Sequence, residues 1–520
     1  MKKWFGLSMG FSFATAVCCL PWAAAQAPGN WSSPRNDAAH SGWQKVETAM
    51  TKENLAKDFK FLWKIQLGTP PAKDSQSYNE PLLAARLINA KGFKDFVIWP
   101  GAQDLYAVDS ELGTMLWTKH YDIAPACGAT SLAAVAEAPP VINFRARRPA
   151  AKPGAAPAAP PPQAGPVPAS ERKLGGSAGG GYFGLRGIYA LTADGQLHEQ
   201  VIITGADFAP PVKFMSGAVG ISQGLGLSGK TIFTATKAGC PGVENAVWAM
   251  TMNGTDYPVA SYKTGSITPL VAMGPTIEDD TAFVVTGAGK SDEAAGVHAN
   301  SVVALGADAK VKDWYTAAGD LQNVTPVAFT YKEKQLLVAP GKDGSYVLLD
   351  AQSLGGADHH TPLASTPVVS RAKEDAIAAL ASWQDKEGNA WVLASVPGTV
   401  SDAAKFADSN GAAPHGSVVA FKVQEDGGKF TLLPAWVSRD LIHPAPPVVA
   451  NGLVIALSQG DSSNHAVLYV LDAETGKELH SSGDAIKTYA HGAGVAVGDG
   501  HVFFVTHDQM LYSFGIGIEH

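Results

Sequence analysis

Three histidines have side chains that could bind a metal ion: His360, His443 and His491. Each lies shortly before a segment that we expect to form the innermost strand of a repeated unit. Imidazoles brought together at one mouth of a ring of such units could hold a transition-metal ion. No short His-x-x-x-His spacing supports this site, so exposed loop histidines are the alternative interpretation.

Cysteine chemistry is limited to four residues. Cys18 and Cys19 fall in the N-terminal leader described below, which leaves Cys127 and Cys240. These two could pair in an oxidising compartment, but the sequence does not place them within bonding distance. The sequence contains no Cys-x-x-Cys-His pattern, so no site for covalent c-type haem attachment is predicted.

Residues 1–25 have the pattern of a secretory signal peptide. Lys2 and Lys3 precede an apolar run, and small residues at 23–25 offer a cleavage site. An N-terminal membrane anchor is the alternative, although Pro21 interrupts the apolar run. No later segment is long enough and apolar enough to span a membrane. We therefore expect a periplasmic or secreted protein, without a membrane span once the leader is removed.

The composition favours an all-β protein with many turns. The 520 residues are 46% hydrophobic and 17% charged, and they include 55 glycines and 34 prolines. Short strands separated by Gly- and Pro-rich turns produce such numbers. The net charge of −8 argues against nucleic acid as a partner, because phosphate binding needs a basic surface.

A pattern of four strands recurs along the chain and shows where the candidate residues lie in the expected fold. It consists of an apolar first strand, a second apolar strand, a third strand resembling Leu-Tyr-Ala-Leu-Asp, a turn with glycine, and a fourth strand that carries tryptophan. The third strand recurs eight times, at 105–109, 188–191, 247–250, 302–305, 346–350, 418–421, 468–472 and 510–514. First strands also number eight, and they begin near 80–81, 139–140, 217–218, 274–275, 325–326, 366–367, 446–447 and 492–493.

These repeats predict an eight-bladed β-propeller over residues 58–515, preceded by an N-terminal segment over 26–57. The last unit ends near Phe514 without a fourth strand, while Phe61-Leu62-Trp63 is similar to Met115-Leu116-Trp117. Residues 58–70 are therefore expected to supply the missing strand and close the ring. A tryptophan there would fill the space between blades and offer its N–H to a backbone carbonyl.

Residues 146–180 interrupt the repeat in the second blade. This tract is rich in alanine, proline and glycine, which predicts a disordered insertion. A tolerated surface loop and a tether for a partner are both consistent with it.

The ordered motifs resemble the quinoprotein alcohol dehydrogenase family, whose propellers bind pyrroloquinoline quinone (PQQ). The resemblance covers most of residues 30–515. It is carried by the segment from Asn30-Trp31 to Trp43, by Gly184-Leu185-Arg186-Gly187, by Thr286-Gly287 and by Gly341-Lys342-Asp343-Gly344.

That resemblance implies roles for two residues and a cation site that has lost its ligands. Lys342 matches a lysine that contacts the quinone, and Asp320 lies close to the place of the catalytic aspartate. The family holds calcium with oxygen ligands against the quinone. Tyr182 and Ala288 stand where an acidic ligand and an asparagine ligand are expected, and Cys127 is alone where the family has a vicinal disulfide.

Three functions follow as hypotheses. The first is an exported, monomeric propeller that binds a protein, glycan or small ligand at the channel mouth, without conventional calcium-dependent turnover. The second is an active PQQ-dependent alcohol or sugar dehydrogenase that uses Lys342 and Asp320. The third is a scaffold of the outer-membrane assembly type.

Overall fold

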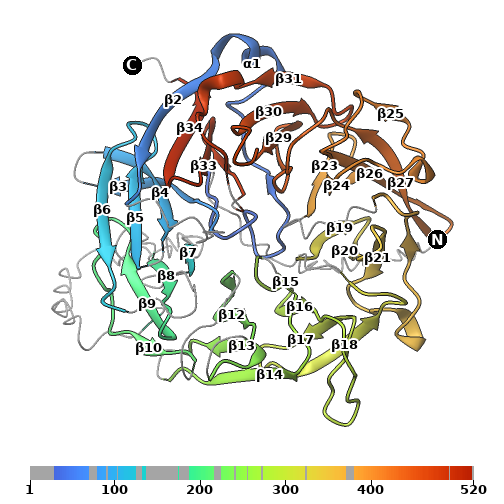
Figure 1. The fold of residues 1–520 in the computed structure, drawn as a ribbon. Helices are drawn as coiled ribbons and strands as arrows, with labels where there is room; N and C mark the ends of the chain where they lie inside the picture. Colours follow the sequence, from blue (N-terminus) through green and yellow to red (C-terminus); the bar gives the residue numbers. More distant parts are fainter. Residues whose placement is uncertain are drawn as a thin grey trace, which may run out of the picture.

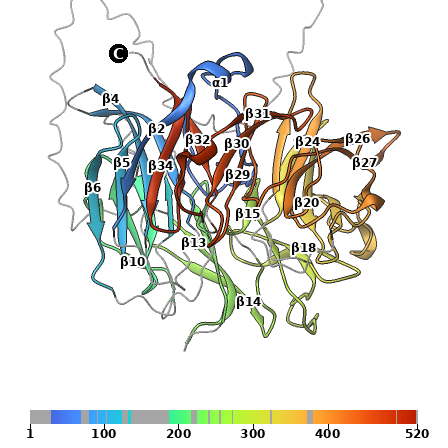
Figure 2. The same cartoon turned by 45° about the horizontal axis from the view of Figure 1, so that its top comes forward.

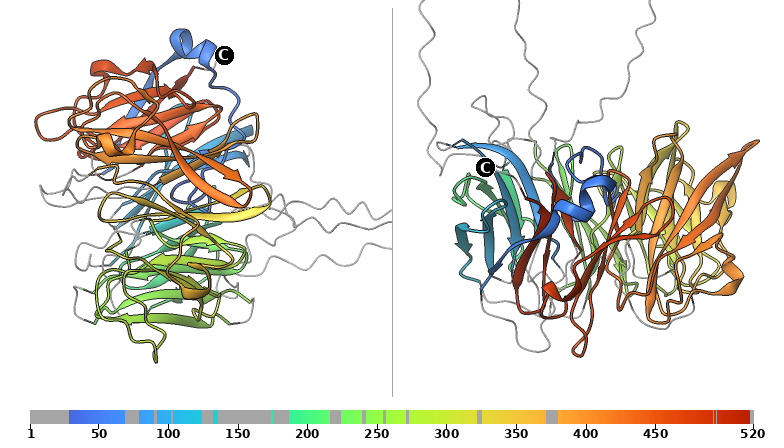
Figure 3. Two further views of the ribbon diagram at one scale, coloured as in Figure 1. Left: turned by 90° about the vertical axis from the view of Figure 1, so that its right-hand side faces the viewer. Right: turned by 90° about the horizontal axis from the view of Figure 1, so that it is seen from above.

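The computed structural model describes residues 29–68, 79–89, 92–101, 103–123, 132–135, 174, 187–215, 224–238, 242–253, 256–270, 273–321, 325–370, 380–490, 492 and 494–517. Eight β-sheets stand radially around a centre and form a disc, seen along its axis in Figure 1 and from the side in Figure 3. The predicted all-β, eight-bladed propeller is confirmed.

The first four blades each contain four strands that follow one another in the chain and in the sheet. Blade one has β3 (Leu82–Asn89), β4 (Gly92–Pro100), β5 (Asp104–Asp109) and β6 (Met115–His120). Blade two has β7 (Leu132–Val135), β8 (Gly187–Leu191), β9 (Gln196–Val201) and β10 (Val212–Lys213). Blade three has β11 (Gly226–Ser228), β12 (Thr231–Thr236), β13 (Asn245–Thr251) and β14 (Val259–Gly265). Blade four has β15 (Thr276–Glu278), β16 (Thr281–Val285), β17 (Ser301–Leu305) and β18 (Val311–Thr316).

Of the other blades, blade six has an extra strand from its own loop, and blades seven and eight each gain a strand from the N-terminal part of the chain. Blade five has β19 (Val327–Tyr331), β20 (Lys334–Pro340), β21 (Tyr346–Asp350) and β22 (Ala364–Ser365). Blade six has β23 (Leu380–Gln384), β24 (Ala390–Pro397), β26 (Gly416–Asp426) and β27 (Lys429–Val437), with β25 (Asp408–Ser409) parallel to β27. Blade seven has β28 (Val448–Ala450), β29 (Leu453–Ser458), β30 (Val467–Asp472) and β31 (Glu478–Ser481), with β1 (Trp43–Gln44) parallel to β28. Blade eight has β32 (Ala496–Gly498), β33 (His501–Val505), β34 (Met510–Ile516) and β2 (Phe59–Gln66).

Helical structure among the described residues is short. Helix α1 (Lys52–Asp58) leads into β2 and begins with a capping box between Thr51 and Asn54. Three 3₁₀ turns, η2 (Gly356–Asp358), η3 (Asp402–Ala404) and η4 (Gly483–Ala485), lie in loops.

Burial of both faces explains why the middle strands do not alternate between apolar and polar residues. All six residues of β29 are buried, as are all five of β17, because neighbouring blades cover both faces of each sheet. Outer strands such as β14 mix exposed and buried residues. Stacking of blades on both sides thus accounts for the continuous apolar runs that revealed the repeat.

The ring is closed by the N-terminal strand, as predicted. Strand β2 pairs antiparallel with β34, with Lys64 opposite Tyr512. Figure 2 shows β2 lying beside β34 and α1 above them. Blade eight therefore contains strands from both the first and the last part of the propeller. Because β2 pairs with β34, β34 has no unpaired edge.

Three fourth-strand tryptophans join successive blades in the same way. The indole N–H of Trp63 donates to the carbonyl of Ser110 at 2.9 Å, and its ring lies on Gly113. Trp117 binds the carbonyl of Ile202 and covers Gly205 in the same arrangement. Trp436 likewise binds the Ala473 carbonyl and covers Gly476.

Trp314, in the same place in blade four, differs. It is stacked between His298 and His359, with ring centroids 4.0 and 3.8 Å away. The seam between blades four and five is therefore packed by imidazoles on both faces of the indole.

The tryptophan contacts correct the strand assignment in blade two. Trp117 binds Ile202, which directly follows β9, whereas Trp63 binds Ser110, which directly follows the third strand of blade one. Strand β9 is therefore the third strand, and the segment 188–191 belongs to the second strand, β8. The third-strand prediction for blade two was wrong because the actual third strand, Gln-Leu-His-Glu-Gln-Val, is too polar to match the pattern.

Three predicted first strands were also misplaced. The structure begins them at Leu132, Gly226 and Leu380 rather than near 139–140, 217–218 and 366–367. Thr366-Pro367 directly follows β22, the fourth strand of blade five, so that proline belongs to a connection. The segment 146–180 lies in the chain between β7 and β8, and apart from Leu174 it falls outside the described residues, as does the predicted leader 1–25.

Residues 29–44 enter the centre of the ring, a course that the sequence did not indicate (Figure 1). Trp31 exchanges two backbone hydrogen bonds with Leu83 of the first strand of blade one, at 2.8 and 2.9 Å. Four carbonyls further along, those of Ala38, Ala39, Ser41 and Gly42, accept N–H groups from the first strands of blades four, five, six and seven. The side chain of Gln44 reaches Val497 in blade eight. This channel segment, residues 29–44, thus ties six blades together.

Candidate functional site

The predicted site residues Asp320, Lys342 and His443 lie on loops at one end of the blades. These loops either join consecutive blades or connect a second strand to a third strand. Because the strands of each blade are antiparallel, both kinds of loop lie at the same end. We call this end the upper face; its loops include 317–326, 341–345, 398–415, 438–447 and 459–466.

Asp320 and Lys342 are brought together on the upper face. The backbone N–H of Lys342 donates to the Asp320 carbonyl at 2.8 Å, and Leu321 pairs with Gly341 beside them. The Lys342 ammonium lies 3.9 Å from the Asp320 carboxylate. Their side chains are 67% and 44% exposed, so this ion pair contributes little stability. The structure therefore places the two residues side by side, with the carboxylate of Asp320 facing the ammonium of Lys342.

The expected cation ligands are not supplied by the described residues. Ala288 follows Thr286-Gly287 after β16, and its exposed methyl group has no oxygen to offer. Tyr182 and Cys127 lie outside the described residues. Within the described part of the chain, no three His, Cys, Asp or Glu side chains come together in a way that could hold a metal ion. A calcium ion needs six to eight oxygens, so these residues do not fit the calcium–quinone site.

The three histidines have different surroundings. His360 lies between η2 and β22, and its Nδ1 is 3.1 Å from the carbonyl of Thr316 on the outer strand of blade four. It therefore precedes a fourth strand, not the first strand of blade six. His443 does precede a first strand, and its Nδ1 is 3.0 Å from the Gly460 carbonyl. His491 lies outside the described residues, as does Cys240.

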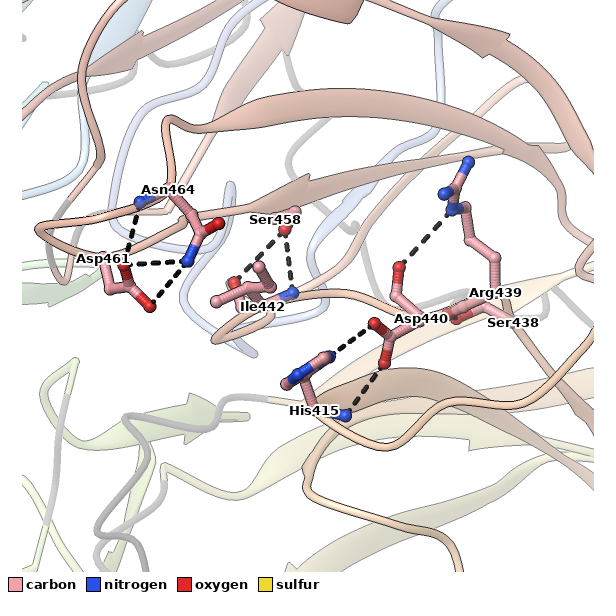
Figure 4. Close-up of polar contacts among 8 residues, drawn as sticks. All are labelled: His415, Ser438, Arg439, Asp440, Ile442, Ser458, Asp461 and Asn464. Carbon is pink, nitrogen blue, oxygen red and sulfur yellow. Dashed lines mark hydrogen bonds and ion pairs between the residues drawn. The ribbon is translucent and has the colours of Figure 1, made fainter.

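A histidine–aspartate pair that the sequence did not reveal lies between blades six and seven (Figure 4). Nδ1 of His415 is 2.7 Å from one oxygen of Asp440, and the backbone N–H of His415 donates to the other at 2.9 Å. Burial alone would raise the pKa of Asp440, but these hydrogen bonds lower it overall. An ionised Asp440 fixes the ring with Nδ1 as donor and leaves Nε2 as the second polar atom.

Hydrogen bonds within and between the neighbouring loops hold the surroundings of this pair in place. The hydroxyl of Ser458 accepts from the N–H of Ile442 at 2.9 Å. The Asp461 carboxylate accepts from the N–H groups of Ser463 and Asn464, and from the Asn464 side chain, as Figure 4 shows for Asn464. The upper face of blades six and seven is therefore an ordered polar surface.

Beneath the upper face, the channel segment fills the centre with buried charged groups. The Arg35 guanidinium donates to the carbonyls of Leu380, Pro446 and Pro447 at the start of two blades. Glu80 accepts from the backbone N–H of Arg35 and from the indole of Trp31. Burial raises the pKa of Glu80 and lowers the pKa of Arg35. The centre of the ring therefore holds a buried, hydrogen-bonded charged cluster around Arg35 and Glu80.

No helix in the described residues is long and apolar enough to cross a membrane.

Comparison with known proteins supports the fold alone. No family model and no curated protein matches the sequence. Quinohemoprotein alcohol dehydrogenase from Comamonas testosteroni is similar over 96% of this chain and 82% of its own, with 12% identity and a TM-score of 0.53. One from Pseudomonas putida has the same coverage and identity, with a TM-score of 0.55. A europium-containing methanol dehydrogenase covers 94% of this chain and 90% of its own, with 13% identity and a TM-score of 0.54.

These likenesses confirm the predicted quinoprotein-type propeller. At 12–13% identity they say nothing about the reaction, because one fold serves many functions.

Proposed function

We propose that this protein is an exported quinoprotein-type propeller that binds a protein, glycan or small ligand on its upper face and does not carry out calcium-dependent quinone turnover. The observation that carries the proposal is the pairing of Asp320 with Lys342, together with Ala288 at the place of an oxygen ligand. Asp320 is the only carboxylate of the implied site that is present, and an ammonium already faces it.

The ordered upper face supports the binding role. His415 is held by two hydrogen bonds to Asp440 yet remains 60% exposed, so it can meet a ligand without rearrangement. Prearranged polar groups lose little entropy on binding.

Export rests on the predicted leader at 1–25. Fractionation of the producing cell should place the protein outside the cytoplasm, and sequencing of the mature N-terminus should begin at or near Gln26. Recovery of full-length chain from the cytoplasm alone would contradict this part of the proposal.

The decisive experiment is reconstitution of the purified protein with PQQ and either calcium or a lanthanide. We expect no alcohol- or sugar-dependent reduction of an artificial electron acceptor, because the cation has too few oxygen ligands. An established quinoprotein dehydrogenase serves as positive control. Turnover above the protein-free background would overturn the proposal.

An active PQQ dehydrogenase is the second candidate, because the resemblance matches Lys342 to a lysine that contacts the quinone and the Lys342 side chain is 67% exposed, open to a ligand. It predicts cofactor absorbance that is lost in Lys342→Ala but kept in Asp320→Asn, with turnover lost in both. Absence of bound quinone at saturating PQQ would eliminate this candidate.

A further inference from the structure

A cavity lies on the upper face at the junction between blade one and blade two. Its volume is about 490 Å³, within the range of about 300–1,000 Å³ that small-molecule sites occupy. Residues 119–123, at the end of β6 and the start of the connection to blade two, line it from blade one. Asp194, Gln196 and His198, from the turn between β8 and β9 and from β9 itself, line it from blade two. The cavity therefore has one wall from each blade.

Rings and apolar side chains form part of both walls. The rings of Tyr121 and His198 come from opposite walls, and their centroids are 4.9 Å apart. Ile123 and Pro211 also line the cavity. An aliphatic chain placed against these groups loses its contact with water, which favours binding. The face of a tyrosine ring also attracts cations.

Two of the cationic groups at the cavity are already held by carboxylates. The Lys119 ammonium is bound to Asp207 of blade two at 2.8 Å. Burial alone would raise the pKa of Asp207, but the nearby His198 and Lys119 side chains lower it overall, so this carboxylate is ionised. Nδ1 of His120 is likewise 2.8 Å from the Asp104 carboxylate. Neither Lys119 nor His120 is therefore left to attract an anion.

Two further carboxylates, one on each wall, are paired with no ammonium or guanidinium of the described residues. Asp122 is fully exposed, and its carboxylate lies 3.6 Å from Nε2 of His120. The Asp194 carboxylate accepts from the Thr192 hydroxyl at 2.5 Å. The nearby Lys213 ammonium donates to the backbone carbonyl of Asp194, not to its carboxylate.

The charge around the cavity thus favours a cationic ligand. Four carboxylates, those of residues 104, 122, 194 and 207, lie around it with the two ammonium groups of Lys119 and Lys213. With neutral imidazoles the balance is negative, and with both imidazoles protonated it reaches zero. A group of this kind never carries the net positive charge that would attract an anion.

We propose that this cavity binds a small aliphatic diamine. One ammonium pairs with Asp122, the other pairs with Asp194, and the aliphatic chain between them lies against Tyr121 and His198. The inference rests on the binding role proposed for the upper face and names the chemistry of one ligand. A monoamine would pair with one wall only, and a neutral molecule of the same length would pair with neither.

Putrescine, a four-carbon diamine, is the probe, and isothermal titration calorimetry of the purified protein is the measurement. Low ionic strength is used because salt screens exposed charges. We expect one saturable site per chain. Butylamine should bind about tenfold more weakly, because it makes one fewer charge-assisted hydrogen bond. Butanol, which has no charge, should show no saturable binding.

Asparagine substitutions locate the site. Asp122→Asn and Asp194→Asn should each weaken putrescine binding about tenfold, and the double variant should abolish it. Asp122 is fully exposed, and an asparagine at 194 keeps an oxygen for the Thr192 hydroxyl, so the fold should persist. Asp308→Asn is the matched control. It removes an exposed carboxylate from the turn between β17 and β18 in blade four and should keep the parent affinity.

Absence of saturable putrescine binding to the parent protein would overturn the inference. Parent-like affinity in a double variant with native circular dichroism would do the same, as would equal binding of butanol and putrescine. These results bear on the cavity alone. Quinone-dependent turnover would overturn the proposed function whatever putrescine does, whereas a protein without turnover that binds no putrescine would contradict only this inference.

Discussion

Trp63, Trp117 and Trp436 each connect one blade to the next through an indole hydrogen bond and a glycine under the ring. The glycine is required for two reasons. Gly476 has φ +68°, and a Cβ there would lie 2.4 Å from the ring of Trp436. The sequence alone predicted an indole N–H bound to a backbone carbonyl, but not which carbonyl, since the partner lies in the following blade.

Replacing Trp436 tests this seam. Trp436→Phe leaves the buried carbonyl of Ala473 without its donor and removes part of the ring, which should cost about 2–4 kcal/mol of unfolding free energy. Gly476→Ala should cost about 1–3 kcal/mol through backbone strain and overlap with the ring. Urea denaturation measures both. Leu112→Ala, at a side chain 58% exposed, is the control and should change stability by less than about 0.5 kcal/mol. An equal loss of unfolding free energy in Trp436→Phe and Leu112→Ala would show that the Trp436 contacts do not stabilise the junction between blades six and seven.

Site residues were only partly predictable. Asp320 and Lys342 were found through the resemblance, and the structure places them 3.9 Å apart. His415 and Asp440 lie 25 residues apart with no characteristic spacing, so no sequence pattern could pair them. Their contact arises because a loop of blade six meets the connection to blade seven, which only the fold determines.

Among the elements, β2 was predictable because its sequence repeats that of β6. Strand β9 was not, because it is polar even at the buried positions Glu199 and Gln200, and its partner strand β8 matched the expected pattern better. The pairing of β1 with β28 was also beyond prediction, since a two-residue strand has no periodicity.

Removal of residues 1–66 tests the closing element. The truncated chain lacks α1, β1 and β2, so β34 becomes an unpaired edge next to aromatic residues that β2 had covered, among them Tyr512 and Phe514. We expect aggregation or non-native oligomers in size-exclusion chromatography. Removal of residues 1–28 keeps every described contact and is the control. A monomeric truncated protein with native near-ultraviolet circular dichroism would show that closure by β2 is dispensable.

At the scale of the whole molecule, the half-buried carboxyl of Glu278 makes stability depend on pH. Burial, with Asp279 and Asp37 nearby, raises the pKa of Glu278 to about 7. The folded state therefore holds a proton that the unfolded state loses near its ordinary pKa. This contribution to stability is present at low pH and is lost as pH rises to about 7.

Glu278→Gln keeps the neutral form at every pH. Its melting temperature should exceed that of the parent protein at pH 8 and approach it near pH 4.5. Differential scanning calorimetry across this range measures the difference. A melting-temperature difference between the two proteins that is the same at every pH would mean that Glu278 does not titrate as proposed.

The channel segment has a consequence for the order of events during biosynthesis. Gly42 bonds to Val449, and Gln44 to Val497, so these early residues must wait for partners that are made more than 400 residues later. Contacts separated by more than 400 residues carry a large loop-closure cost and slow folding. The centre of the ring cannot be completed before blades seven and eight have been made. Until then, residues 29–66 must be kept from pairing elsewhere.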